Sequence, residues 1–484
     1  MKNFIKEGLT FDDVLIEPRY SNILPKNVNL KSKLTKNINI NIPILSSAMD
    51  TVTESKMATA LAKEGGIGFI HKNMSIENQV KEVCKVKKNS KYVIKNIICV
   101  NPYTSLLEAK QAIIKNNSLG CPVIDKNNNL VGIITNRDIR SCNDFKSNIV
   151  KSVMTQKNNL ITIKEVKEKK FLLNIFKLYC IKQIILIDEK FSFIGLITKK
   201  SIEKIDKISS ECIDKKGKLR IGAAVGVTNF IERVDELVKA EIDIILIDAS
   251  HGHSRNVINC IKKIRLKYDS LQIIGGNIAT KEAAIDLRKA GVNAVKVGIG
   301  CGSICITRIV TGVGVPQISA IFNVAKALNK SDIPIIADGG IRFSGDIAKA
   351  LSAGASCVMV GSMFAGTKES PGKLIKYKNK LFKSYRGMGS EGAMLKGSYD
   401  RYFQEFNKIN KFVPEGVEGI VPYKGKLKDI IYQQTGGLRS CMGLIGCKNI
   451  KELHKKAKFI KISNASIKEN HTYNIIVTKK TTNY

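Results

Sequence analysis

Residues 333–362 read IPIIADGGIRFSGDIAKALSAGASCVMVGS, and this stretch contains two short apolar runs, 333–337 and 357–360. Each run ends in glycine or polar residues, as a buried strand does, and an amphipathic segment joins them. We therefore predict a strand–loop–helix–strand unit of the kind that builds a parallel sheet.

Six further apolar runs of the same kind occur along the chain. They span residues 42–46, 66–70, 220–225, 242–247, 272–275 and 294–297. Eight strands, most of them followed by a helix, predict an α/β fold in the form of a (β/α)8 TIM barrel, with the active site on the loops after the strands. An open, doubly wound sheet remains the alternative, because a count of strands does not establish closure.

Two segments between the second and third strands repeat each other at a fixed offset. Asp125 and Thr135 recur as Asp188 and Thr198, 63 residues later, and each copy is predicted to run helix, strand, turn, strand, helix. We interpret the repeat as an inserted two-module domain. The predicted boundaries are 1–91 and 207–484 for the barrel, 92–152 for the first copy and 153–206 for the second.

The composition is that of a soluble globular protein. Of the 484 residues, 44% are hydrophobic and 25% are charged, and no apolar run is long enough to span a membrane. The first ten residues lack the apolar segment of a secretory signal. We expect a cytoplasmic protein whose 12 scattered cysteines are reduced thiols.

The formal charge of +37 raises the possibility of a nucleic-acid-binding protein. However, 66 of the 79 basic residues are lysines, there is no tryptophan, and aromatic residues make up only 6%. Nucleic-acid grooves favour arginine forks and aromatic platforms, so we predict no specific nucleic-acid partner.

Glycines follow the last two predicted strands, in Asp338-Gly339-Gly340 and Gly361-Ser362. TIM barrels commonly bind phosphate at these two loops, where glycine lets backbone amides approach the oxygens. Asp338 would repel phosphate, so it is better suited to accept hydrogen bonds from a sugar diol. The substrate is therefore expected to be a sugar phosphate or a nucleotide.

The loop after the sixth strand, 298–307, reads GIGCGSICIT. Cys305 lies at the predicted barrel mouth, where backbone donors favour a reactive thiolate, whereas nothing distinguishes Cys301 from a packing residue. The exposed carbonyls of such a loop can also bind a cation. Asp248, Ser250 and Asn277, at the ends of the fourth and fifth strands, are candidates for a second ligand.

Several long motifs resemble those of inosine-5′-monophosphate (IMP) dehydrogenases, in the IMP dehydrogenase/GMP reductase family, over essentially the whole chain. The motifs are LTFDDV at 9–14, SSAMDTVT at 46–53, GSICIT at 302–307, DGGIR at 338–342, YRGMGS at 385–390 and DRYF at 400–403. The resemblance implies that NAD oxidises IMP to XMP through a covalent thioimidate on Cys305. The residues implied for phosphate, ribose and base are Ser47, Met49, Ser303, Asp338, Gly339, Gly340, Gly361, Ser362, Tyr385, Gly387, Met388, Gly389 and Glu415.

The resemblance also implies a mobile flap at about 396–424, whose Arg401-Tyr402 pair enters the NAD site after NADH leaves. Arg401 would then activate water as the proton acceptor, although free guanidinium is almost always protonated. Thr307 and Glu415 provide a second relay. The residues implied for NAD are Asp248, Ser250, Asn277, Gly298 and Gly300.

A monovalent cation, K⁺, is implied as well, together with a homotetramer or an octamer of paired tetramers. The implied ligands are the carbonyls of Gly300, Gly302 and Cys305, with Glu469, Asn470 and His471 of a neighbouring subunit. Cys301 replaces a proline that stiffens this loop in the family, so the loop is expected to be less rigid.

The insert resembles the tandem CBS module of the family. Thr135 and Asp138 of the first copy match the positions that bind the ribose of a purine nucleotide effector, whereas Ser201 replaces the carboxylate in the second copy. We predict nucleotide binding mainly at the first motif, and a purely structural insert is the competing interpretation.

Two other functions stay open. GMP reductase shares the barrel and the cysteine loop but normally lacks the CBS insert and the Arg-Tyr flap. A regulatory nucleotide-binding protein without catalysis is opposed by the presence of Cys305, Thr307 and Arg401 together.

Overall fold

The computed structural model describes residues 5–88, 90–116, 118–142, 148–208, 210–404 and 412–478. The chain forms two compact units, of which the first comprises residues 1–87, 210–212 and 220–484, and the second 88–209 and 213–219. The two units are described separately below.

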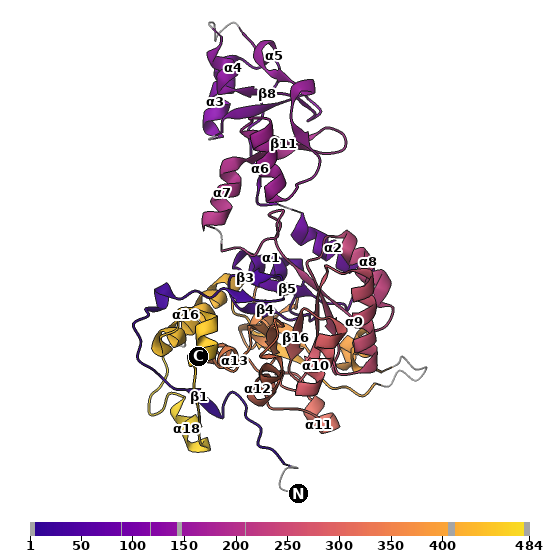
Figure 1. Ribbon diagram of the computed structural model, residues 1–484, viewed down its shortest axis with the longest axis vertical. Helices are drawn as coiled ribbons and strands as arrows, with labels where there is room; N and C mark the ends of the chain where they lie inside the picture. Colours follow the sequence, from indigo (N-terminus) through magenta and orange to yellow (C-terminus); the bar gives the residue numbers. More distant parts are fainter. Residues whose placement is uncertain are drawn as a thin grey trace. The chain divides into compact units, whose positions relative to one another are not determined.

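Eight strands of the described chain form a closed parallel barrel in the first unit (Figure 1). In barrel order they are β4 (Ile44–Ser46), β5 (Ile67–Ile70), β13 (Gly222–Val225), β14 (Ile244–Asp248), β15 (Gln272–Ile278), β16 (Ala294–Val297), β17 (Ile335–Asp338) and β18 (Cys357–Val360). Pairing of β18 with β4 and of β5 with β13 closes the ring. The TIM-barrel prediction is confirmed, and the open-sheet alternative is wrong.

The predicted strand boundaries differ from the observed ones mainly at the carboxyl ends. β15 continues three residues beyond the predicted end, so Asn277 lies within the strand, and β14 and β17 include Asp248 and Asp338. Polar residues can end a buried strand here because their side chains face the cavity at the barrel mouth.

Amphipathic helices surround the barrel and contact one another in sequence around the ring. They are α1 (Ser55–Lys63), α2 (Ile76–Lys87), α8 (Phe230–Lys239), α9 (Arg255–Lys267), α10 (Lys281–Ala290), α12 (Gln317–Leu328), α13 (Ser344–Ser352) and α16 (Leu427–Ile445). Contacts of α16 with both α13 and α1 complete the ring.

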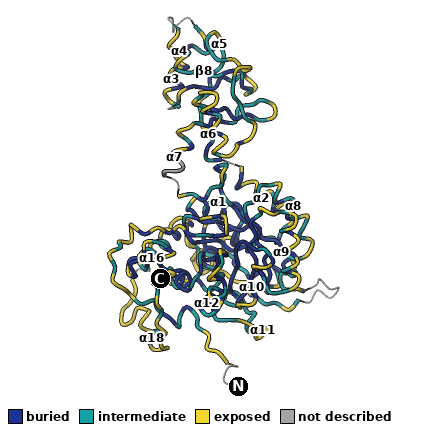
Figure 2. Tube along the Cα trace, viewed as in Figure 1, coloured by how far each residue is buried: buried dark blue, intermediate teal, exposed yellow. Residues whose placement is uncertain are grey.

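The core of the barrel is filled by side chains from its strands, as the dark centre of Figure 2 shows. Leu45, Phe69, Leu246 and Met359 belong to one buried cluster. Leu34 joins it from the hairpin of β2 (Ser32–Lys33) and β3 (Asn39–Ile40). The barrel interior is therefore packed, and a cavity lies at its mouth.

Additional elements of this unit build the rim. β19 (Leu374–Tyr377), β20 (Lys380–Arg386) and β21 (Glu418–Pro422) form an antiparallel sheet, and β1 (Val14–Ile16) pairs with β22 (Phe459–Lys461). The remaining elements are η1 (Pro25–Asn27), α11 (Thr307–Thr311), α14 (Ser362–Ala365), α15 (Glu391–Met394), η3 (Ser398–Tyr402), α17 (Ile450–Lys456) and α18 (Asn464–Glu469). The centre of the predicted flap, 405–411, lies outside the described residues.

The second unit repeats one set of elements at the predicted spacing. In the first copy, α3 (Leu106–Lys115), β7 (Gly120–Ile124) and β8 (Leu130–Thr135) precede α4 (Asn136–Arg140). Adding 63 to each strand boundary gives β11 (Gln183–Ile187) and β12 (Phe193–Thr198), and the flanking helices are α6 (Lys169–Leu178) and α7 (Lys199–Ile208). Both strand pairs have a register irregularity at the same position, which confirms the internal repeat.

Shorter elements complete this unit. They are β6 (Val93–Ile94), α5 (Val150–Val153), β9 (Thr155–Gln156), η2 (Lys157–Asn159) and β10 (Thr162–Ile163). Each copy has its own apolar cluster, one around Ile134 and one around Ile197, and a third cluster joins Leu130 of the first copy to Ile185 and Leu196 of the second.

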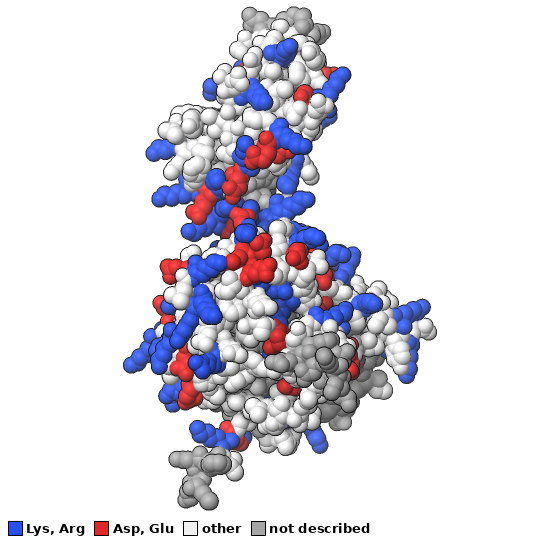
Figure 3. All heavy atoms as spheres, turned by 90° about the vertical axis from the view of Figure 1, so that its right-hand side faces the viewer, with Lys and Arg blue, Asp and Glu red and all other residues white. Residues whose placement is uncertain are grey.

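Charged side chains of both signs occur on the face drawn in Figure 3. On the face drawn in Figure 3, Asp and Glu side chains are interspersed among the Lys and Arg side chains of both units. No helix in the described part of the chain is both long and apolar enough to cross a membrane.

Candidate active site

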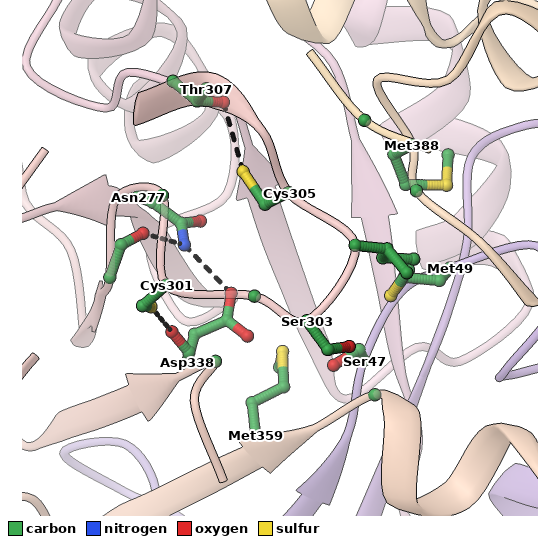
Figure 4. A pocket seen from close by; sticks show the side chains of 18 of the residues that line it. Ser47, Met49, Asn277, Cys301, Ser303, Cys305, Thr307, Asp338, Met359 and Met388 are labelled. Carbon is green, nitrogen blue, oxygen red and sulfur yellow. Dashed lines mark hydrogen bonds between the residues drawn. The ribbon is translucent and has the colours of Figure 1, made fainter. Parts of the chain in front are cut away.

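An open cavity of about 980 Å³ lies at the mouth of the barrel, where the predicted site residues meet (Figure 4). Loops after β4, β14, β16, β17 and β18 line it, together with segments around Tyr385, Arg401 and Glu415. In Figure 4, Cys305 lies between Asn277 on one side and Met49 and Met388 on the other. Cys305 therefore lies between two differently lined halves of the cavity, with its sulfur directed towards Thr307.

Cys305 begins a chain of polar contacts. Its sulfur lies 3.1 Å from Thr307 Oγ1, and the Thr307 hydroxyl donates to Glu415 Oε2 at 2.8 Å. A thiol, a hydroxyl and a carboxylate in this order can pass a proton away from the sulfur or from a water molecule beside it.

Backbone pairing explains why Glu415 reaches the cysteine loop. Ile306 N donates to Glu415 O at 2.9 Å, and Val417 N donates to Ile304 O at 3.0 Å. The Glu415 amide in turn donates to the Gly389 carbonyl at 2.9 Å. Two segments more than 100 residues apart are thus held in register around Cys305.

Cys301, in the same loop, has a different environment. Its sulfur contacts the Asp338 carbonyl at 3.0 Å and faces away from Cys305 in Figure 4. Burial, reinforced by the negative charge of Asp338, raises the pKa of the Cys301 thiol to about 12. A thiol of this kind stays protonated near neutral pH, as suits a packing residue.

Arg401 occupies the half of the cavity predicted to bind NAD. Its guanidinium forms an ion pair with Asp248, and its carbonyl accepts a hydrogen bond from Ser250 N at 3.0 Å. Beside it, burial raises the pKa of the Tyr402 hydroxyl. The Asp400 carboxylate pairs with Lys72 and anchors this segment to the loop after β5.

A buried polar network lies beneath Arg401. Asn277 donates to Asp338 Oδ2 at 2.9 Å and to Gly298 O at 2.8 Å. Lys296 donates to the same Asp338 oxygen at 2.6 Å, and its nitrogen lies 3.0 Å from Asp248 Oδ1. The carboxylates at the ends of β14 and β17 are therefore held by one ammonium group.

The glycine loops after β17 and β18 form the opposite wall. Gly339 and Gly340 have φ values of +92° and +81°, which only glycine adopts readily. A Cβ on Gly361 would lie 3.0 Å from Tyr385 Oη and 3.3 Å from Met49 Sδ, so side chains from two other segments converge on it. Burial raises the pKa of Tyr385 to about 12, against the effect of a hydrogen bond with Ser303.

Most predicted site residues line this cavity. They are Ser47, Met49, Asp248, Ser250, Asn277, Gly298, Gly300, Gly302, Ser303, Cys305, Thr307, Asp338, Gly339, Gly340, Gly361, Ser362, Tyr385, Gly387, Met388, Arg401, Tyr402 and Glu415. Gly389 is absent from the lining and instead supports Glu415 from behind. Glu469, Asn470 and His471, at the end of α18, do not line it either.

The sequence reasoning missed Lys296 and Met359, which also line the cavity. Lys296 carried a signal, because a lysine in the middle of the apolar run Ala294–Val297 would be buried and would need a partner. Met359 carried none, since a methionine in a strand reads as core.

Metal binding by clustered side chains finds no support in the described residues, which contain no group of three or more His, Cys, Asp and Glu side chains suited to an ion. His253 instead contacts Asp286 at 3.1 Å.

In the second unit, Asp138 accepts from Thr135 N and Oγ1, both at 2.8 Å, and caps α4.

Comparison with known proteins gives a consistent result. The family model described as IMP dehydrogenase / GMP reductase domain matches residues 8–473. The inosine-5′-monophosphate dehydrogenase of Haemophilus influenzae is 55% identical to the chain, and the match covers 99% of the chain and 98% of that protein. The inosine-5′-monophosphate dehydrogenase of Escherichia coli K12 is 54% identical, and the match covers 100% of the chain and 99% of that protein.

Among solved structures, a cysteine-to-alanine variant of GMP reductase from Trypanosoma brucei, in complex with guanosine 5′-monophosphate, superposes with a TM-score of 0.77 at 35% identity. The match covers 98% of this chain and 99% of that one. Fold, site and sequence agree, and the chain is a member of the IMP dehydrogenase / GMP reductase family.

Proposed function

We propose that this protein oxidises IMP to XMP with NAD and water, the committed step towards guanine nucleotides. The observation that carries the proposal is the contact chain from Cys305 through Thr307 to Glu415, in a cavity that also holds the glycine loops and Arg401. This set supplies a nucleophile, a proton relay and a phosphate site within one space.

In the first half of the reaction, the Cys305 sulfur adds to C2 of the purine and forms a tetrahedral adduct. Loss of the C2 hydride, for which NAD would supply the acceptor, would leave a covalent thioimidate on Cys305, and the thiol proton would pass to Glu415 through Thr307. Asp338 would hold the ribose, and the loops at Gly340 and Gly361 the phosphate. Fixing the phosphate and ribose sets the distance between C2 and the sulfur, which lowers the entropic cost of attack.

In the second half, water attacks C2 of the thioimidate, the carbon–sulfur bond breaks, and XMP and the free thiol are released. Glu415 and Thr307 are suited to take the proton of this water. Arg401, which lines the same cavity, is the second residue that we propose as a proton acceptor in this step.

NAD supplies the acceptor for the hydride when bound, and Asp248, Ser250 and Asn277 are the residues we propose to hold it. Arg401 contacts two of them, through the Asp248 carboxylate and the Ser250 amide. Arg401 and NAD would therefore exclude each other, and the enzyme would alternate between a hydride-transfer form and a hydrolysis form.

GMP reductase activity is the second candidate. The Trypanosoma brucei GMP reductase aligns with 98% of this chain, so its chain extends through the insert. The presence of an insert therefore does not separate the two activities, contrary to our sequence-based argument. The Arg401-Tyr402 segment still favours the dehydrogenase.

The decisive test is absorbance of NADH when the protein is mixed with IMP and NAD. We expect steady NADH formation, a nucleotide-sized mass addition on the protein during turnover, and loss of both in Cys305→Ala. NADPH-dependent consumption of GMP without IMP oxidation would support the reductase instead, and no reaction with either would support a regulatory protein.

A K⁺ site in the cysteine loop belongs to the same proposal. Gly298 and Gly300 have positive φ angles, and no described backbone amide donates to the carbonyls of Gly300 or Cys305, so these oxygens remain suited to a cation. The partner ligands at 469–471 would come from a neighbouring subunit of a tetramer. Turnover that is independent of K⁺ would contradict this site.

We further propose that the insert is a tandem CBS domain that binds a purine nucleotide effector through the Thr135–Asp138 motif. Asp138 also caps α4, and Ser201 makes the equivalent contacts with Thr198 in the second copy. Helix capping alone would explain these residues if the insert were purely structural. Calorimetry with ATP and GTP on the protein and on Asp138→Asn separates these two interpretations.

A further inference from the structure

Lys296 is a buried cation within an apolar strand. It follows Ala294 by two residues on β16, and Ala294 belongs to the cluster that fills the barrel, so both side chains point inward. Lys296 is only 2% exposed. A lysine is rarely buried this deeply unless it is paired, so its partners explain why it is there.

The partners of the Lys296 ammonium come from three other strands. They are Asp248 Oδ1 on β14 at 3.0 Å, Asp338 Oδ2 on β17 at 2.6 Å, and Asn277 Oδ1 on β15. The second oxygen of Asp248 faces Arg401. Two cations and two carboxylates thus form one line, Arg401–Asp248–Lys296–Asp338, at the floor of the cavity.

The two ends of this line have different tasks in the proposed reaction. Asp338 has no hydrogen-bond partner for Oδ1 among the described residues, so this oxygen remains available for the ribose, while Oδ2 is fixed by Lys296 and Asn277. Asp248 holds Arg401 or, when Arg401 withdraws, faces the space for NAD. Without the ammonium, two neighbouring carboxylates would repel each other in a buried space.

We propose that Lys296 is a positioning residue that offsets the repulsion between the Asp248 and Asp338 carboxylates and aligns them, and thereby links the ribose site to the Arg401 site. The proposal rests on the function proposed above. In this proposal Lys296 does not contact a reacting atom. Other titratable groups near the line are the Cys301 thiol and the Tyr385 hydroxyl, both next to Asp338.

The test is the pH dependence of kcat/KM for IMP in Lys296→Met. Without the cation, one of the two carboxylates retains a proton at neutral pH, so we expect a loss of about a hundredfold at pH 7 that is largely recovered as pH rises towards 9. A general loss of structure would lower activity equally at every pH. The matched control is Lys87→Met, which removes another buried lysine–carboxylate pair, with Asp243, outside the cavity.

Chemical rescue provides the second readout. Ethylammonium should restore the IMP-dependent activity of Lys296→Ala at saturating K⁺. Tetramethylammonium, which has no N–H donor, should not restore it. An unchanged pH profile of Lys296→Met together with absence of rescue would overturn the proposal. Because the wild-type protein is assayed in parallel, failure of the proposed function would appear separately, as no IMP-dependent NADH formation in any variant.

Discussion

Two cysteines four residues apart show how surroundings determine the chemistry of a side chain. Cys301 is enclosed between Asp338 and the glycine loops, and burial keeps its thiol protonated. Cys305 opens to the cavity and contacts Thr307. The position of Cys305 in its loop predicted this difference from the sequence, and the access and partners of the two sulfurs in the structure agree with it.

Arg401 and Thr307 are expected to act after hydride transfer. Arg401→Ala should slow hydrolysis of the covalent intermediate by about a hundredfold or more, the contribution of a positioned proton acceptor. Hydride transfer should be nearly unchanged in Arg401→Ala, since Arg401 neither contacts the sulfur nor accepts the hydride. Rapid mixing would then show a burst of NADH followed by slow turnover.

Thr307→Val is the companion variant, since it keeps the shape of the side chain and interrupts the contact with Glu415. If the rate of the NADH burst and the steady-state rate of turnover fall by the same factor in both variants, neither residue acts specifically in hydrolysis.

At the scale of elements, short contacts between distant segments hold the flap end in place. Gly389 follows β20, and its carbonyl accepts from the amides of Glu415 and Gly416, which precede β21. The ring of Tyr402, in η3, packs directly over Gly389. Three separate elements therefore meet at a residue that has no side chain.

Gly389→Ala tests this arrangement. The added Cβ would lie 2.6 Å from Tyr402 Cζ, so the ring and η3 must move. We expect hydrolysis to slow about tenfold or more while the free energy of unfolding changes by only about 1 kcal/mol. Equal kinetics of Gly389→Ala and the wild type would show that the position of Tyr402 is unimportant.

The matched control for this substitution is Gly419→Ala on β21. No atom lies within 4 Å of its added Cβ, so this variant should behave like the wild type.

At the scale of the whole molecule, each unit has its own apolar core. The barrel cluster includes Phe69 and Leu246, whereas the insert clusters form around Ile134 and Ile197. Chains with separate cores often unfold in more than one step, so a single melting temperature need not describe this protein.

Calorimetric unfolding with and without IMP tests this expectation. IMP at one hundred times its dissociation constant should stabilise the barrel by about 2.7 kcal/mol, because it binds the native barrel and not the unfolded chain. The transition of the barrel should rise by several degrees and that of the insert should not move. A single transition that shifts as a whole would mean that the units unfold together.

The sequence by itself determined eight strands that alternate with helices, because apolar runs with polar carboxyl ends and amphipathic segments between them leave few other ways to bury the apolar faces. It left a closed barrel and an open sheet both possible. It also determined the 63-residue repeat and, since loops that follow parallel strands share one end of a barrel, the part of the cavity lining that follows the strands. The rest of the predicted lining, such as Met49, Tyr385 and Glu415, was implied by the family resemblance.

Only the tertiary structure decided which of these residues touch. Three of these contacts join segments about 100 or more residues apart: the strand pairing that closes the ring, the hydrogen bond from Thr307 to Glu415, and the ion pair of Arg401 with Asp248. The proposed role of Lys296 also depends on the tertiary structure, because other strands place two carboxylates beside this lysine of an apolar run. Contacts of this kind depend on distances in space, and the spacing of residues along the chain predicts such distances only within one helix or strand.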